Sequence, residues 1–149
     1  MEIDREARAK AYASIEVAAT PEAVWSLLVD IPRWPDWNPQ VRSASLEGPL
    51  DAGTRLTFRF GRRPGALHSQ IRLVEPCRLL AWTGTLFGTS TAHVYRLEAV
   101  GGQTRVSSEA SWDGLLVRML SRPLSMLMRR ANLAGIQHLK REAEREAHR

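Results

Sequence analysis

His93 and Tyr95 are the residues of this sequence best suited to chemistry, and they stand two positions apart in a segment where polar and apolar residues alternate. Successive side chains of a β-strand point to opposite faces, so these two share one face. A histidine can act as a general acid or base near neutral pH, and a tyrosine hydroxyl can orient a ligand oxygen. A hydrogen-bonded pair in the core would have the same spacing. We therefore treat both as catalytic candidates and keep the structural alternative open.

Two serines and three tryptophans are further candidates for contact with a ligand. The alternation places Ser69 and Ser108 on inward faces, where a hydroxyl favours a wet or ligand-filled space over a fully packed core. Trp37, Trp82 and Trp112 can form aromatic walls around a planar or lipid-like molecule, or they can fill the core. These residue types point to binding more directly than to a reaction.

The histidines and the single cysteine show no pattern of a metal or redox site. His93 and His138 have no carboxylate or cysteine at a spacing typical of a ligand set. We therefore predict no metal and no cofactor. Cys77 has no second cysteine to pair with, which fits a reducing compartment, so we predict a cytoplasmic location.

The charge pattern argues against two classes of partner. The net charge is +5, and all but two of the 21 basic residues are arginines. They are scattered rather than gathered in a basic and aromatic motif, so we predict no nucleic-acid partner. No run of about 18 uncharged apolar residues occurs, so we expect no stable membrane insertion. The composition leaves the oligomeric state open.

The elements that must position the candidate residues follow from alternation and turn chemistry. The first predicted element is a strand over 12–18. Thr20 as N-cap and Pro21 then predict a helix that ends at about Val29. A short helix or turn follows over 31–39, where Trp34 and Trp37 anchor the chain. Short connections rich in glycine and proline favour an antiparallel meander of six more strands, over 40–48, 53–60, 66–75, 78–86, 88–100 and 103–113. The alternation predicts these inward residues: Leu56, Phe58, Phe60, Leu67, Ser69, Ile71, Leu73, Leu80, Trp82, His93, Tyr95, Leu97, Val106, Ser108, Ala110 and Trp112.

The last element is an amphipathic helix over 115–140 with a broad apolar arc. At about 100° per residue, one stripe of the arc holds Leu116, Leu120, Leu124, Leu127, Ala131, Ala134 and His138. The opposite side holds Arg118, Arg122, Ser125, Arg129 and Asn132. So wide an arc needs a concave partner, and the curved sheet supplies one. Pro123 predicts a kink, unless the helix restarts at Ser121.

Several motifs resemble the START-like, helix-grip (SRPBCC) superfamily, and most closely its polyketide cyclase/dehydrase branch. They are the segment Ala-Thr-Pro-Glu-Ala-Val-Trp-Ser-Leu-Leu-Val-Asp at 19–30, Trp34, the Trp-Asn-Pro triplet at 37–39, the segment 75–84 and the closing helix. The resemblance covers about residues 11–143. It implies an α+β helix-grip fold, in which a seven-stranded curved antiparallel sheet wraps a long C-terminal helix and two short helices follow the first strand. It also implies a cavity for an apolar ligand, but it carries over no catalytic residue.

We therefore expect a charged leader over 1–10 and one ligand-binding domain over 11–145. The domain is expected to bind a small hydrophobic molecule, such as a lipid, a polyketide or another aromatic or apolar metabolite, between the sheet and the last helix. One alternative is a cyclase or dehydratase that uses His93 and Tyr95. Another is a module that binds a membrane surface or a protein through Arg118, Arg122, Arg129 and the basic loop 61–65. The predicted ligand-binding residues are Trp37, Phe58, Ser69, Trp82, His93, Tyr95, Ser108, Trp112, Leu120, Leu124, Leu127 and Ala131.

Overall fold

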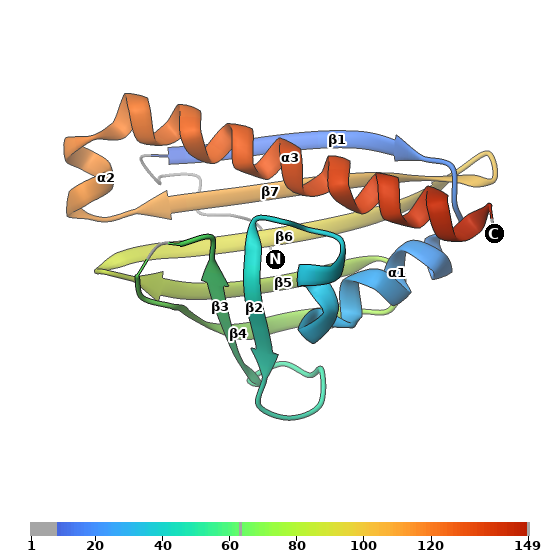
Figure 1. Ribbon diagram of the computed structural model, residues 1–149, viewed down its shortest axis with the longest axis horizontal. Coiled ribbons are helices and arrows are strands. Elements are labelled where there is room, and N and C mark those ends of the chain that lie inside the picture. Colours follow the sequence, from blue (N-terminus) through green and yellow to red (C-terminus); the bar gives the residue numbers. More distant parts are fainter. Residues whose placement is uncertain (1–8, 63, 149) are drawn as a thin grey trace.

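The computed structural model describes residues 9–62 and 64–148. In these residues one seven-stranded antiparallel sheet has the strand order β1-β7-β6-β5-β4-β3-β2 (Figure 1). The strands are β1 (Ala9–Val17), β2 (Val41–Leu46), β3 (Arg55–Phe60), β4 (Leu67–Glu75), β5 (Leu79–Leu86), β6 (Thr89–Val100) and β7 (Gln103–Asp113). The helices are α1 (Pro21–Val29), η1 (Ile31–Asp36), α2 (Leu115–Met119) and α3 (Ser121–Ala147). This is the predicted α+β helix-grip fold.

The long helix α3 lies toward one side of the sheet. It packs mainly on β1 and β7, and its C-terminal part meets α1 (Figure 1). Two side chains tie it to edge strand β1, because Arg129 Nε donates to the Lys10 carbonyl at 3.1 Å and Lys140 Nζ donates to the Glu16 carbonyl at 2.8 Å. The concave face of the remaining strands, β6 to β2 in the sheet order, must therefore be covered by other elements.

The short helices α1 and η1 supply that cover at one end. Thr20 Oγ1 accepts from the Ala23 amide at 3.2 Å, which confirms the predicted N-cap. Trp34 Nε1 in η1 donates to the Leu28 carbonyl in α1 at 3.1 Å, so the two helices hold one another. The indole is thereby fixed over the middle of the sheet.

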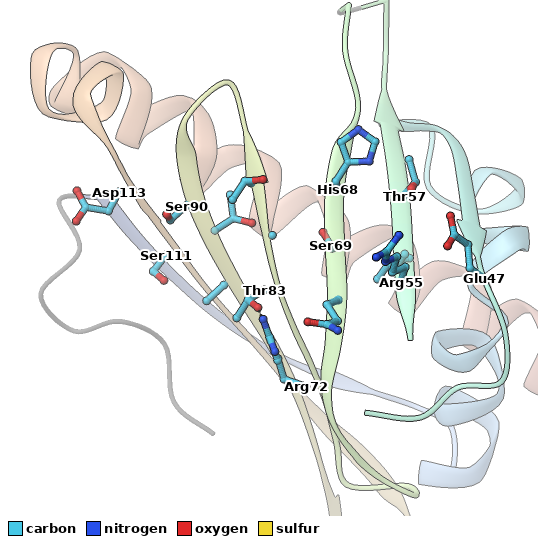
Figure 2. A pocket seen from close by; sticks show the side chains of 16 residues that line it. Glu47, Arg55, Thr57, His68, Ser69, Arg72, Thr83, Ser90, Ser111 and Asp113 are labelled. Carbon is cyan, nitrogen blue, oxygen red and sulfur yellow. Dashed lines mark hydrogen bonds between the residues drawn. The ribbon is translucent and has the colours of Figure 1, made fainter. Parts of the chain in front are cut away.

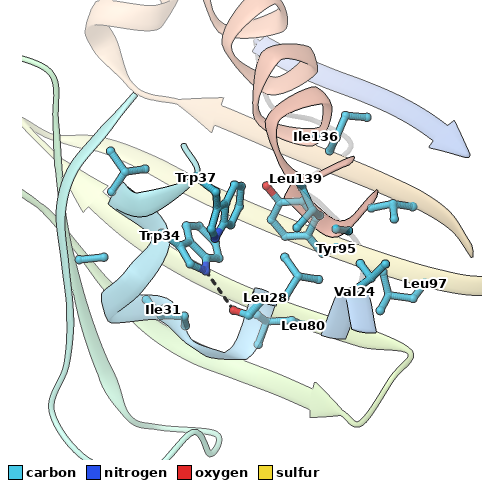
Figure 3. Packing of buried hydrophobic residues seen from close by; sticks show 14 of the residues in the cluster. Val24, Leu28, Ile31, Trp34, Trp37, Leu80, Tyr95, Leu97, Ile136 and Leu139 are labelled. Atoms are coloured by element: carbon cyan, nitrogen blue, oxygen red, sulfur yellow. Dashed lines mark hydrogen bonds between the residues drawn. The ribbon is translucent and has the colours of Figure 1, made fainter. Parts of the chain in front are cut away.

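The core is built around Trp34. Its ring lies 5.3 to 6.2 Å, centroid to centroid, from the rings of Trp37, Phe58, Trp82 and Tyr95. Toward α1 the core continues through fully buried aliphatic side chains, namely Val24, Leu28, Leu80, Ile136 and Leu139 (Figure 3). Burial of such side chains is the main favourable term in folding.

Two predictions about the C-terminal helix need correction. It breaks at Leu120, whose φ of −119° and ψ of 34° are not helical, and α3 begins at Ser121. Pro123 therefore falls in the first turn, where a missing N–H costs no intrahelical hydrogen bond, and it does not kink the helix. The helix does restart here, as the alternative predicted, but Leu120 and not Ser121 stands at the N-cap position. The helix also runs on to Ala147 rather than ending near Lys140.

The inner side of α3 is rotated from the predicted stripe. The residues that it buries are Asn132, Gly135, Ile136, Leu139 and Ala143, whereas the predicted Ala131 is exposed. A shift of the buried side by one residue along the sequence corresponds to a rotation of the helix by about 100°. The apolar arc of the helix is broad enough to bury either the predicted stripe or the observed side. In the observed rotation, Arg129 and Lys140 donate hydrogen bonds to carbonyls of β1.

The register of the sheet shifts at two places, between Val41 and Ser43 and between Ile71 and Leu73, and the second shift moves a predicted inward residue. A bulge between Ile71 and Leu73 shifts the register, so Leu73 pairs with Ala81 and packs on the outer face with Leu79 and Val94. Leu73 was predicted to point inward, and the extra residue of the bulge is the reason that it does not. At the N-terminus, β1 includes Ala9 and Lys10 of the expected leader, whose residues 1–8 lie outside the described residues.

Candidate functional site

The concave face of the sheet is packed at one end and open at the other. Near α1 the inward residues of β5 to β7, such as Leu80, Leu97 and Val106, are buried. Toward the β5–β6 turn the inward residues keep part of their exposure, and they are Phe60, Leu67, Thr91, His93 and Trp112. This difference follows from the position of α3, which covers β1 and β7 and leaves the middle strands uncovered at that end.

A polar network lies at the boundary between the two ends. His93 Nε2 is 2.8 Å from Ser108 Oγ, and Ser108 Oγ donates to Asn132 Oδ1 at 2.7 Å. Asn132 Nδ2 donates in turn to the Ser108 carbonyl at 3.1 Å. Because the serine proton is used by Asn132, the neutral histidine must carry its own proton on Nε2. The network thus fixes both the rotamer and the tautomer of His93.

Both catalytic candidates are uncharged at neutral pH. Burial lowers the pKa of His93 to about 4, and burial raises the pKa of Tyr95 to about 12 against the opposing effect of a hydrogen bond with Ser108. The imidazole stacks against both Trp82 and Tyr95, each 4.7 Å away between ring centroids, and those two rings are 5.8 Å from one another. At pH 7 the pair therefore offers hydrogen bonds and aromatic surface rather than an acid–base couple.

We expect the free energy of unfolding to fall as the pH drops from about 6.5 to about 4. Unfolded His93 takes up a proton near its ordinary pKa of 6.5, whereas folded His93 resists protonation until about pH 4, so acid favours the unfolded chain in this window. The loss from this residue is at most about 3 kcal/mol. Urea unfolding of wild type and of His93→Gln at several pH values measures it. An equal slope in both proteins would show that His93 is not the group responsible.

Two hydroxyls on the open part of the concave face have no hydrogen-bond partner among the described residues. Ser69 Oγ and Thr91 Oγ1 are both buried, and their residues flank Gly84 in register, on β4 and β6 respectively. A Cβ at position 84 would overlap the Ser69 hydroxyl and lie 2.7 Å from the His68 carbonyl oxygen, so only glycine fits there. Buried polar groups without partners are rare in folded proteins, and their presence suggests that another molecule completes them.

The structure brings most of the predicted site residues together. Trp37, Phe58, Trp82 and Tyr95 belong to the aromatic cluster, Ser69, His93 and Ser108 adjoin it, and Trp112 is half-buried at the open end. The predicted helix residues do not join them in the core: Leu124 is half-buried, and Leu120, Leu127 and Ala131 are exposed. Gln40 Nε2 donates to the Ala131 carbonyl at 3.2 Å, so this flank of α3 faces the segment that joins η1 to β2.

Comparison with known proteins identifies the family. The sequence model of the family described as polyketide cyclase / dehydrase and lipid transport matches residues 8–144. The chain belongs to this family. None of the curated proteins matches the chain by sequence.

Solved structures of low sequence identity share the helix-grip fold of this family member. A hypothetical protein from Helicobacter pylori superposes with a TM-score of 0.81 at 16% identity, over 93% of this chain and 90% of that one. The Zhui aromatase/cyclase from Streptomyces sp. R1128 gives 0.79 at 15% identity, over 93% and 94% of the two chains. The di-domain aromatase/cyclase StfQ from the steffimycin biosynthetic pathway gives 0.74 at 15% identity, over 93% of this chain and 46% of that one.

Sequence reasoning missed three residues of the candidate site. Asn132 was placed on the polar side of the helix, although its spacing of four from Ile136 was a usable signal. Thr91 lies two residues before His93 and shares its face, so alternation could have found it. Gln40, which bridges Asn38 and α3, gave no signal, because its role depends on contacts far apart in the sequence.

A separate groove crosses the outer face of the sheet, away from the helices (Figure 2). Its volume is about 900 Å³, and its walls include Arg55, His68, Arg72, Thr83 and Asp113. Arg72 Nε donates to Thr83 Oγ1 at 2.7 Å across it. The groove is polar, and it does not contain the aromatic cluster. Among the described residues no three His, Cys, Asp or Glu side chains come together, and no helix is long and apolar enough to cross a membrane.

Proposed function

We propose that this polyketide cyclase-like protein binds a small, mainly apolar molecule at the open end of its concave face. The observation that carries the proposal is the contrast between the two ends, one packed with aliphatic side chains and the other leaving inward aromatic residues partly exposed. Small-molecule sites are usually lined by apolar and aromatic side chains with a few polar groups, and the open end has this composition. The predicted ligand-binding residues are part of this proposal.

The open end offers three kinds of contact to such a molecule. Trp82, His93 and Trp112 present aromatic surface, and the flank of α3 adds Leu124. Ser69 and Thr91 carry hydroxyls that are buried just beneath this surface and have no hydrogen-bond partner among the described residues, so a ligand reaches them through a water molecule or a small side-chain movement. A ligand with a ring or acyl chain and at least one hydroxyl or carbonyl group matches these contacts, which is consistent with a lipid, a polyketide or a related aromatic metabolite.

Ring closure or dehydration of a bound polyketide is the second candidate. The His93–Ser108–Asn132 network favours it, since it holds one imidazole in a fixed tautomer, and two of the structural neighbours are named aromatase/cyclases. Binding is favoured over catalysis because the pKa of His93 lies near 4 and that of Tyr95 near 12. If catalysis occurs, His93→Gln lowers the rate of conversion of bound linear polyketide far more than it lowers the affinity, to which the imidazole contributes aromatic contact.

Titration with an uncharged apolar fluorophore, N-phenylnaphthylamine, tests the binding site. Thr91→Phe places a ring in the open end, whereas Ser90→Phe places the same ring on the opposite face, beside the outer groove. We expect saturable binding to wild type and to Ser90→Phe, and affinity weakened about tenfold or more by Thr91→Phe, the equivalent of about 1.4 kcal/mol. Absence of saturable binding, or a loss with Ser90→Phe alone, would contradict the proposal.

Removal of the unpaired Ser69 hydroxyl should stabilise the ligand-free protein. We expect Ser69→Ala to raise the free energy of unfolding by about 1 kcal/mol, because a buried hydroxyl without a partner carries a desolvation cost. Ser108→Ala is the matched control, and it should destabilise, since its hydroxyl is bonded to Asn132. Urea denaturation of both variants measures the effects, and a similar loss in both would show that Ser69 is satisfied in the folded chain.

A further inference from the structure

Helix α2 and the first half of α3 expose an unusual number of large apolar side chains. We call them the α2–α3 surface: Leu115, Leu116, Met119, Leu120, Met126, Leu127 and Leu133, each between 44% and 75% exposed. Single exposed apolar residues are normal, but a group of this size on two adjoining helices marks an interaction surface.

The helical geometry points part of this surface away from the sheet. At about 100° per residue, Met126, Arg130 and Leu133 lie between about 100° and 160° from the buried Asn132. They therefore face outward and have no core to join. Arginine and apolar side chains alternate on this outer side, which is the pattern of a helix that lies in a membrane interface.

The charge of the same segment has one sign. From Gly114 to Arg141 the chain has no aspartate or glutamate and has six basic residues, whereas Glu142, Glu144 and Glu146 follow directly after it. Arg118 pairs with Asp113 at 3.4 Å, but Arg122 and Arg130 form no ion pair with the described residues and are exposed. The segment therefore presents unpaired positive charge beside its apolar side chains.

Other exposed groups gather at the same end of the sheet (Figure 1). In an antiparallel sheet, the β3–β4 loop, the β5–β6 turn and the start of α2 all lie at one end. Phe87 in the turn is 72% exposed and contacts Gly65 of the loop. Arg62 of the basic loop is also exposed, while Arg63 lies outside the described residues. The β3–β4 loop, the β5–β6 turn and the start of α2 thus together make this end of the sheet both apolar and basic.

We propose that the α2–α3 surface docks this protein on an anionic phospholipid membrane. The leucine and methionine side chains enter the boundary between headgroups and acyl chains, and the arginines extend to the lipid phosphates. Charge complementarity selects this occupant. A second copy of the chain would bring the same unpaired arginines face to face, and a zwitterionic bilayer, whose choline groups offset its phosphates, would attract them much less. The proposal does not depend on the ligand site, although docking in this way would bring the open end of the concave face close to the bilayer.

Sedimentation with vesicles tests the proposal on the full chain. We expect binding to vesicles of equal parts phosphatidylglycerol and phosphatidylcholine, little binding to phosphatidylcholine alone, and weakening by added salt. Met119→Asp with Met126→Asp should lower the partition coefficient about tenfold or more. Tyr12→Asp is the control, because Tyr12 is 65% exposed on β1, outside the α2–α3 surface.

A second pair of variants separates the local charge from the net charge. Arg122→Glu with Arg130→Glu should weaken binding to anionic vesicles. Arg55→Glu with Arg78→Glu changes the net charge by the same amount, but these exposed residues lie outside this end of the sheet. The second variant should therefore bind nearly as well as wild type. The proposal is overturned if wild type does not bind anionic vesicles at low salt, or if the two charge variants lose binding equally. It is also overturned if ultracentrifugation shows a dimer that Met119→Asp with Met126→Asp dissociates, since a second copy would then cover the surface.

Discussion

Trp34→Ala is expected to destabilise the protein by about 3 to 5 kcal/mol. Trp34 is buried among the rings of Trp37, Phe58, Trp82 and Tyr95, so truncation leaves a cavity in the middle of the aromatic cluster. It also removes the hydrogen bond to the Leu28 carbonyl that joins η1 to α1. The free energy of unfolding by urea, followed by far-ultraviolet circular dichroism, measures the loss.

Trp25→Ala is the matched control for that variant. Trp25 lies on α1, keeps part of its exposure and packs at the margin of the same core. Its truncation should cost less than half as much as that of Trp34. Equal losses would mean that Trp34 is not the centre of the core.

Asn132→Ala should cost about 2 kcal/mol, since the change removes two hydrogen bonds to buried groups of Ser108. The Ser108 hydroxyl loses its acceptor, and the Ser108 carbonyl loses its side-chain donor. The variant should also free the His93 ring, which an altered imidazole chemical shift would report. Gln137→Ala, an exposed position on the same helix, should stay within about 0.5 kcal/mol of wild type. Equal effects at the two positions would show that the network contributes nothing.

The local rules of the sequence predicted the strands and the N-terminal helices well. Alternation located β7 at 103–113 and the shared face of His93 and Tyr95, because side-chain direction in a strand depends on position alone. Thr20 and Pro21 predicted the start of α1, because capping depends on the residues next to the helix. These features need no knowledge of distant contacts.

Apart from Thr91, which alternation could have found, the features that were missed depend mainly on tertiary contacts. α3 is rotated so that it forms hydrogen bonds with β1, and no local sequence pattern encodes these bonds. In this rotation Asn132 faces the core and bonds to Ser108. Leu73 moved to the outer face through a bulge whose position alternation does not predict. The exposure of Leu120 and Leu127 arises because α3 covers β1 and β7 and not the middle of the sheet. The open end of the site was therefore beyond prediction from the sequence.

Heteronuclear NMR during titration with N-phenylnaphthylamine tests the central claim, that the open end of the concave face is a ligand site. The account predicts that the largest amide shift changes fall on Leu67, Trp82, His93 and Trp112, none of which lines the outer groove, and that Val24 in the packed end hardly moves. Largest changes at Arg55 and Arg72, which line the outer groove, would place the ligand on the other face of the sheet and contradict the account.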